Sequence, residues 1–441
     1  MKKLSFLLLV LVTLSCQKKK SPEEYGKITN NPEFYHGTFE KLTDVIIHDI
    51  FSPPVASRIY LLTTLAGYEA LVPGNPEYKS MAGKYKDFTA PPQPEAGKEY
   101  CYPLASIKAI FTVARKITFT VTKYDEFENG VYKQFKDAGV PEDVFERSVA
   151  YGEAVAGHVM EYSKKDNYAK TRGQRYTVKN EEGKWVPTPP QYADAMEPYW
   201  NTIRTAILDS ANLFPAAPVI PYSKDKNSPF WKELMDLYNI GKNLTEEQKS
   251  TAWFWDDNAF VMNVQGHVMF ANKKMTPGGH WLAITRTVSR QEKADLMKSA
   301  EAYLLVSAAL YDGFISCWYE KYKSEKVRGE TVINAEIDPK WMPFLQTPPF
   351  PEYTSGHSTI SSASAEVLTA LFGDRVAFTD STEYKYGHGV KKFNSFREAA
   401  ENCGISRIYG GIHYKSGCNE GLICGAKIGK YIILKTKNKE I

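Results

Sequence analysis

The sequence predicts an all-α fold. Several long stretches place apolar residues at steps of three and four, which is the spacing of one helix face. Strict alternation of apolar and polar residues, the pattern of a half-buried strand, is rare. The chain has 441 residues, 43% hydrophobic and 24% charged, so it can bury a large core, and this composition excludes a disordered protein.

The first 16 residues resemble the signal peptide of a bacterial lipoprotein. Two lysines precede the apolar run Leu4 to Leu14, and the small Ser15 is followed directly by Cys16. The run is too short to span a bilayer. We expect export to the periplasm or cell envelope, with a lipid anchor on Cys16 and a polar tether over residues 17–40. An ordinary secretory signal with an incidental cysteine is the alternative.

Residues 41–290 are expected to form an N-terminal helical region. Its predicted helices are Val55 to Leu71, Leu104 to Thr122, a helix opening at Pro141 that contains Val144 to Val159, and Thr245 to Phe254. Between them, Arg172 to Asn227 is rich in proline and aromatic residues. Within it, the apolar segments on either side of Asn180 to Gly183 predict a small hairpin. Long irregular segments of this kind are often functional, so we expect this one to wall the mouth of a site.

Residues 291–436 are expected to form the core that carries the site. The predicted helices are Arg290 to Lys323, Ser362 to Phe372, Phe393 to Asn402 and Gly421 to Leu434. Cys403 and Cys418 bracket a glycine-bounded segment, and an exported compartment permits a disulfide between them. The cysteine spacing lacks the paired motif of a zinc site.

The sequence has no large excess of positive or negative charge that would attract a charged partner over its whole surface. The 55 basic and 51 acidic residues leave a net charge of +4, which does not point to nucleic acid or to an anionic membrane surface. A positive site must therefore be local, and the partners we expect are small molecules, with membrane contact only through the lipid anchor.

Three short segments place polar residues next to helix boundaries, and together they predict a site for a tetrahedral oxyanion. They are Lys321 to Arg328, Tyr353 to Thr359 and Ser406 to His413. The second offers a hydroxyl and a glycine amide at a helix start, where the macrodipole is positive. Lysine and arginine side chains from the other two suit the oxygens of phosphate or vanadate. Carboxylates are nearly absent from these segments, which argues against a cage for a divalent metal.

The pattern Lys-x6-Arg, Ser-Gly-His and Ser-Arg-x3-Gly-x-His resembles the signature of the vanadium-dependent haloperoxidase and type 2 phosphatidic acid phosphatase superfamily. Two upstream segments, Asp49 to Arg58 and Gly278 to Trp281, are similar to the bacterial haloperoxidase-like branch. The resemblance implies that Lys321, Arg328 and Arg407 neutralise the oxyanion and that Ser355 and Gly356 hydrogen-bond to it. It implies that His413 binds the central atom, as the axial ligand of vanadate or as a phosphohistidine nucleophile, and that His357 is the acid/base.

The sequence departs from this family pattern in one place that matters for chemistry. Gly417 stands where the family has an aspartate that orients the histidine, and losses of that kind cost about 10 to 100-fold at metal sites. Glu420 or a backbone carbonyl is the expected substitute. Two prolines of the pattern are replaced by Gly329 and Thr354, which loosens the backbone.

Other residues carry weaker signals. Lys321 belongs to a lysine-rich helix end, so a solvated face is the alternative, with Lys323 in its place at the site. His280, in a Gly-Gly-His-Trp turn, is a candidate pocket residue. The pair Asp256-Asp257 has no histidine at a fixed offset and is interpreted as structural.

The function we expect is peroxide-dependent halide oxidation by a vanadium haloperoxidase-like enzyme, with vanadate as cofactor and halide and peroxide as substrates. One alternative is an exported acid phosphatase without a cofactor that hydrolyses phosphate monoesters. A second is a lipoprotein that binds an oxyanion without catalysis.

Overall fold

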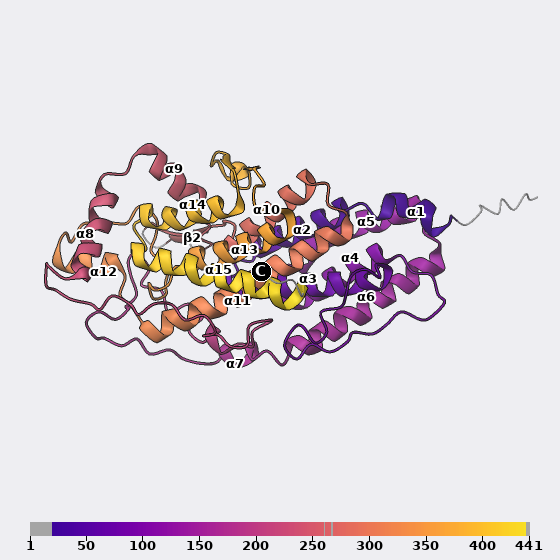
Figure 1. Ribbon diagram of the computed structural model, residues 1–441, viewed down its shortest axis with the longest axis horizontal. Helices are drawn as coiled ribbons and strands as arrows, with labels where there is room; N and C mark the ends of the chain where they lie inside the picture. Colours follow the sequence, from indigo (N-terminus) through magenta and orange to yellow (C-terminus); the bar gives the residue numbers. More distant parts are fainter. Residues whose placement is uncertain (1–19, 260, 266–267, 438–441) are drawn as a thin grey trace, which may run out of the picture.

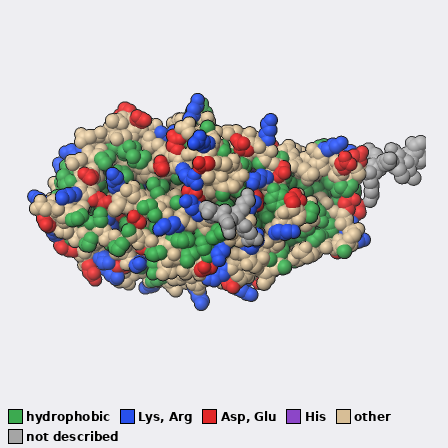
Figure 2. Space-filling model, in the orientation of Figure 1, with side chains coloured by type: hydrophobic (Ala, Val, Ile, Leu, Met, Phe, Trp, Pro, Cys, Tyr) green, Lys and Arg blue, Asp and Glu red, His purple; other side chains and the backbone are tan. Residues whose placement is uncertain are grey.

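The computed structural model describes residues 20–259, 261–265 and 268–437. The expected signal peptide and Cys16 lie outside these residues. The described chain is mainly α-helical, as the sequence predicts, with two small antiparallel sheets. None of its helices combines the length and the apolar character needed to cross a membrane. Lys, Arg, Asp and Glu side chains are interspersed over the face seen in Figure 2, in keeping with the near-balance of charge.

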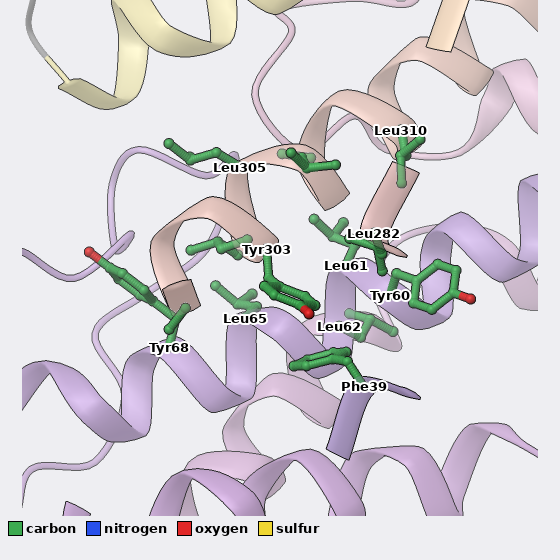
Figure 3. Packing of buried hydrophobic residues seen from close by; sticks show 14 of the residues in the cluster. Phe39, Tyr60, Leu61, Leu62, Leu65, Tyr68, Leu282, Tyr303, Leu305 and Leu310 are labelled. Carbon is green, nitrogen blue, oxygen red and sulfur yellow. The ribbon is translucent and has the colours of Figure 1, made fainter. Parts of the chain in front are cut away.

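The N-terminal half forms one end of an elongated molecule (Figure 1). Its main helices are α2 (Glu33–His48), α3 (Pro53–Leu71), α4 (Tyr102–Ile117), α5 (Asp125–Ala138) and α6 (Glu142–Ser163). Helix α3 is buried on all sides from Pro54 to Leu71, because it packs against α4, α6 and α11 (Leu296–Ser324) together. Figure 3 shows Leu61 and Leu65 of α3 among Phe39 of α2 and Tyr303 of α11. This packing joins the two halves through one hydrophobic core.

The expected tether is folded over the residues described. Residues 20–40 contain α1 (Pro22–Thr29) and the first half of α2 instead of an extended polar segment. Ser21 and Glu24 form a capping box that starts α1. Tyr25 and Tyr35 are buried in the core, and their burial explains why this polar-looking stretch is folded.

The C-terminal half is a bundle around α13 (Gly356–Phe372). This helix contacts α10 (Pro277–Gln291), α11, α14 (Phe396–Tyr409) and α15 (Lys415–Lys437). Helix α15, yellow in Figure 1, lies alongside α13. Smaller helices cover the ends, namely α7 (Tyr168–Thr171), α8 (Pro229–Lys242), α9 (Glu246–Phe254) and α12 (Gly329–Glu336).

The strands are short and peripheral to this bundle. Strand β1 (Val261–Gln265) pairs with β2 (Val268–Asn272), and β3 (Phe378–Asp380) pairs with β4 (Lys391–Phe393). The hairpin expected around Asn180 to Gly183 is not formed. The segment pairs instead with the chain that follows α11: the amide of Trp185 donates to the carbonyl of Glu325 at 2.7 Å, and Val327 donates to Gly183 at 3.0 Å. The backbone of this segment thus forms hydrogen bonds with the chain after α11 instead of with itself, which is why no hairpin forms.

The expected disulfide is also absent. Cys403 and Cys418 are free and buried. The hydroxyl of Ser361 contacts the Cys403 sulfur at 3.2 Å, so this thiol packs against α13 rather than against Cys418.

Candidate active site

A cavity between the ends of several C-terminal elements is lined by two of the three sequence motifs, and Arg328 of the first motif contacts His413 on its wall. Gly356 and His357 line it from the start of α13, Arg407 from the last turn of α14, and His413 from the loop before α15. The loops around Met196 and Phe350 form other parts of its wall. The proline-rich middle segment therefore reaches the site, as expected, through Met196.

Ser355 begins α13 and presents the helix start to this cavity. Its hydroxyl accepts a hydrogen bond from the amide of Ser358 at 3.3 Å, which caps the helix. Its own amide donates to the carbonyl of Gly417 at 3.0 Å. The first amides of α13 have no partner within the helix and can donate to an anion, whereas the Ser355 hydroxyl also hydrogen-bonds to the Cys418 thiol.

Arg328 and Arg407 are buried, and their guanidinium groups are fixed by backbone carbonyls. Arg328 donates to Phe350 at 2.9 Å and to Ile412 at 2.6 Å. Arg407 donates to Trp255 at 2.5 Å. Each keeps one buried nitrogen without a partner, Nη2 of Arg328 and Nε of Arg407. Buried N–H groups of this kind require an acceptor, so the site is built to receive one.

Lys321, not Lys323, lies buried beside the cavity wall at Phe350. The Lys321 ammonium is fully buried and donates to the carbonyls of Pro351 at 2.8 Å and Glu352 at 3.1 Å, which leaves one of its three donors free. Burial and then the charge of Arg328 lower the pKa of Lys321 to about 7. The side chain of Lys323 is 57% exposed and pairs with Glu320.

His413 is oriented by a carboxylate that sequence reasoning missed. Its Nδ1 lies 2.8 Å from Oε1 of Glu352, and the same oxygen accepts from the amide of Tyr414 at 3.1 Å. A side chain on Gly417 would collide with this carboxylate, so the missing aspartate is what makes room for Glu352. Glu420 does not take the role, because it accepts from the amide of Ala217 at 3.1 Å. The signal in the sequence was an acidic residue beside the Ser-Gly-His motif, together with the glycine itself.

The nitrogen of His413 that faces the cavity is available as a ligand. Nε2 lies 3.4 Å from Nη1 of Arg328. Burial, followed by the charges of Arg328 and Lys321, holds the pKa of His413 well below its usual value. The imidazole is therefore neutral at neutral pH, and with Nδ1–H donated to Glu352 its Nε2 carries a lone pair.

His357 lies in the same cavity and has a free nitrogen. Burial and then the charge of Arg407 hold the pKa of His357 well below its usual value, against a hydrogen bond to the backbone of Asp256. Its Nε2 has no partner. An anion bound nearby would raise this pKa, which suits a group that must take up and release a proton.

The remaining wall is apolar. Phe314, Trp318 and Phe350 line the cavity together with Pro53 and Pro348. Phe350 also lies under two of the cations, with the Lys321 nitrogen 4.8 Å and the Arg328 guanidinium carbon 5.0 Å from its ring centre. The site thus combines cationic hydrogen-bond donors with an apolar wall.

His280 is fully buried and reaches the cavity only through Asp257. Its Nδ1 lies 3.0 Å from Oδ2 of Asp257, which lines the cavity, and its Nε2 lies 2.9 Å from Oδ2 of Asp380. Asp257 therefore has a histidine partner 23 residues further along the chain, although the sequence shows none at a fixed offset.

These groups fit an oxyanion bonded to a histidine. Arg328 and Arg407 offer unpaired N–H donors, and the cationic charge around His413, which includes Lys321, exceeds what Glu352 neutralises. An oxyanion would satisfy the donors, and Nε2 of His413 can bind its central atom.

Known proteins resemble this chain in sequence and in fold. The family described as the VCPO second helical-bundle domain matches residues 301–439. The crystal structure of the first bacterial vanadium-dependent iodoperoxidase aligns with a TM-score of 0.87 and 41% sequence identity, over 92% of this chain and 97% of that one. The holo-type bacterial vanadium-dependent chloroperoxidase aligns with a TM-score of 0.64 and 16% identity, over 88% and 93% of the two chains. No curated protein sequence matches this chain.

Proposed function

This chain belongs to the vanadium-dependent haloperoxidase family, and from that membership we propose that it oxidises iodide with hydrogen peroxide at a vanadate held by His413. The observation that carries the proposal is the set of buried N–H groups without acceptors near a neutral histidine whose Nε2 faces the guanidinium of Arg328 at 3.4 Å. A phosphate-like tetrahedral oxyanion of vanadium matches both requirements.

Five side chains and one helix start would hold the cofactor. Lys321, Arg328 and Arg407 would compensate its oxygens, and Ser355 and the Gly356 amide would donate hydrogen bonds to them. His413 would be its protein ligand, held in one tautomer by Glu352. When bound, vanadate supplies a Lewis-acid centre that activates peroxide.

His357 is the residue of the site that can move protons. Its unpartnered Nε2 faces a cavity in which peroxide must lose protons and a departing oxygen must gain one. A neutral imidazole accepts the first of these protons, and a bound anion makes the resulting imidazolium stable enough to return it.

The apolar wall favours iodide among the halides. Phe314, Trp318 and Phe350 offer no donors to the cavity except the indole N–H of Trp318, which is used by the carbonyl of Met196 at 3.2 Å. A large, weakly hydrated anion loses least when it leaves water for such a surface. The aligned iodoperoxidase, at 41% identity, supports the same choice.

The test is a halide oxidation assay on the purified protein with and without added vanadate. We expect iodide oxidation that requires both vanadate and peroxide, with kcat/KM for iodide above that for bromide. His413→Ala should abolish it, because the cofactor loses its protein ligand. Glu420→Gln is the matched control and should keep full activity, since Glu420 contacts only the backbone of Ala217 among the hydrogen bonds found for it. Phosphate ester hydrolysis without vanadate and no halide oxidation with it would contradict the proposal.

We also propose that the protein is exported and anchored through Cys16, on the pattern of residues 1–16. Mass spectrometry of the mature N-terminus should find a lipid-modified Cys16. An unmodified N-terminus at Met1 would contradict it.

A further inference from the structure

A second group of buried titratable residues lies behind the active-site cavity, and the reaction above does not yet use it. Asp257, His280 and Glu383 each place a ligand atom within 4.8 Å of the others, and all three are buried. Asp380 closes the group on the far side of the His280 ring. These residues come from three separate segments, since Asp380 ends β3 and Glu383 follows it closely in the chain, so the fold converges on them.

His280 holds this group together as a cation. Its two nitrogens face Asp257 at 3.0 Å and Asp380 at 2.9 Å, and the ring stacks on Trp255 with centroids 4.4 Å apart. Burial alone would lower the pKa of His280, but the two carboxylates outweigh it and hold this pKa well above its usual value. An imidazolium between two carboxylates fixes the position of Asp257 on the cavity wall.

Glu383 is different because one of its oxygens is unused. The residue is 2% exposed and its Oε1 has no hydrogen-bond partner. Burial and then the charge of Asp257 hold the pKa of Glu383 well above its usual value. An uncompensated carboxylate at this depth is costly, whereas a carboxylic acid is not.

The chain on either side of Glu383 reaches the surface. Its chain neighbours Thr382 and Tyr384 line a surface cavity of about 180 Å³, which we call the outer cavity. Tyr384 is 71% exposed, and the charged residues Asp44 and Lys385 also line the outer cavity. Glu383 is thus adjacent in the chain to residues of the outer cavity, and one of its carboxylate oxygens lies within 4.8 Å of Asp257, which lines the active-site cavity.

We propose that Glu383 and Asp257 form a proton relay from the outer cavity to the active-site cavity, with His280 as the residue that positions Asp257. This rests on the proposed function. Halide oxidation consumes a proton: iodide and peroxide with one H⁺ give hypoiodous acid and water. Iodide loses two electrons, the O–O bond breaks, an I–O bond forms, and the second oxygen leaves as water.

The relay supplies the proton of that water. Asp257 gives a proton to the cavity, Glu383 reprotonates Asp257, and solvent in the outer cavity reprotonates Glu383. The charges that face the pair are His280, Asp380 and the Lys274–Asp256 ion pair at 2.5 Å, and His357 and His388 interact with the group electrostatically. Burial and the charge of Asp257 raise the pKa of Glu383 in spite of the cations His280 and Lys274, so a proton on Glu383 is favoured.

The test compares Glu383→Gln with Glu383→Asp and with the control Glu69→Gln. Glu69 is also a buried glutamate with a raised pKa, but it accepts from the amide of Met81, on α3 and away from both cavities. Glu383→Gln should lower kcat for iodide about 10-fold or more without changing KM for iodide. Added small buffer acids should restore its rate, Glu383→Asp should retain most activity, and Glu69→Gln should match the wild type.

A measurement on the protein without cofactor is independent of turnover. The infrared difference spectrum between wild type and Glu383→Gln at neutral pH should contain the carbonyl stretch of a protonated carboxyl group. A carboxylate band in its place, or a Glu383→Gln variant with wild-type kcat and pH profile, overturns the relay alone. Binding of one divalent cation per wild-type protein, lost in Glu383→Gln, would also overturn the relay, because Asp257 would then be a metal ligand. Absence of halide oxidation in the wild type overturns the proposed function and the relay together.

Discussion

At the scale of single residues, His413 depends on a carboxylate from a distant loop. Glu352 lies 61 residues before it and contacts both its Nδ1 and the amide of Tyr414. A second contact ties Glu352 to Lys326, whose nitrogen lies 3.7 Å from Oε2. One buried side chain thus sets the tautomer of the ligand histidine and holds the loop that carries it.

Glu352→Gln should therefore weaken vanadate binding by about 10 to 100-fold, the usual cost of losing a group that orients a metal ligand. The amide keeps the shape of the side chain but no longer accepts the proton of Nδ1 with a full negative charge. Calorimetric titration with vanadate measures the effect. Unchanged affinity would show that Glu352 is only structural.

Gly417→Asp provides the reciprocal test. The new side chain would collide with Glu352, so the single variant should lose stability and binding. Gly417→Asp combined with Glu352→Ala removes the collision and returns a carboxylate to the position that the family pattern gives it. Vanadate affinity in the double variant should exceed that of either single variant, and an affinity no better than theirs would contradict the pairing.

Local sequence patterns predicted the histidines, the arginines and Ser355, because each belongs to a short motif at a helix boundary. They could not predict Glu352 or the link between Asp257 and His280. Those contacts join side chains that are far apart in the sequence and meet only in the folded chain. The residues next to an acidic side chain in the sequence do not indicate which distant residue it contacts. From the sequence alone, Gly417 indicates the loss of an aspartate. The structure shows that the glycine makes room for Glu352, which replaces that aspartate beside His413.

At the scale of elements, the position of α13 is set by glycines on α15. A side chain at Gly425 would collide with the carbonyl of Thr359, and one at Gly429 with the carbonyl of Ala363. The two helices therefore approach more closely than other side chains allow. Because α13 starts at the active site, this contact also places Ser355 and Gly356.

Gly425→Ala should destabilise the protein by about 1 to 3 kcal/mol through overpacking and should also lower vanadate affinity. Gly157→Ala is the matched control, since Gly157 lies in α6 with open space around it. That change should be neutral or slightly stabilising, by up to about 1 kcal/mol. Urea unfolding measures the change in stability of both variants. A loss in Gly425→Ala alone indicates overpacking between α13 and α15, whereas a loss in both indicates that replacing any helical glycine destabilises the protein.

The contact between α2 and α11 includes a buried titratable group. His36 is fully buried, with Nδ1 3.2 Å from the Tyr303 hydroxyl, and burial lowers the pKa of His36 to about 4 from 6.5. The unfolded chain takes up this proton below pH 6.5 while the folded chain does not. Stability is therefore full above that pH and falls as the pH drops towards the folded value.

Between pH 7 and pH 5 the His36 contribution amounts to a loss of about 2 kcal/mol. His36→Gln should remove that part of the pH dependence, whatever it does to stability at pH 7. Denaturant unfolding of both proteins at the two pH values measures the difference. Equal losses in both would contradict the assignment.

At the scale of the whole molecule, periodicity predicted most helices of the core and their all-α class. It placed the polar-looking residues 20–40 outside the fold, because α1 and the first turns of α2 are stabilised by a few buried aromatic residues, and the aliphatic residues of α2 come only after residue 40. The expected hairpin failed for a related reason, since its backbone groups pair with the chain after α11. Both errors concern long-range partners rather than local propensity.

The site is an unsatisfied cationic pocket, so its ligand should stabilise the whole fold. Vanadate at about 100 times its Kd should add about 2.7 kcal/mol to the free energy of unfolding. Thermal unfolding with and without vanadate should show a higher Tm in the wild type and no change in His413→Ala.

The most direct test of the account is a crystal structure of the protein with vanadate. We expect vanadium next to Nε2 of His413, with its oxygens on Nη2 of Arg328, Nε of Arg407 and the start of α13, and with Glu352 still on Nδ1 of the histidine. Vanadate bound elsewhere, or in this cavity without contact to His413, would contradict it.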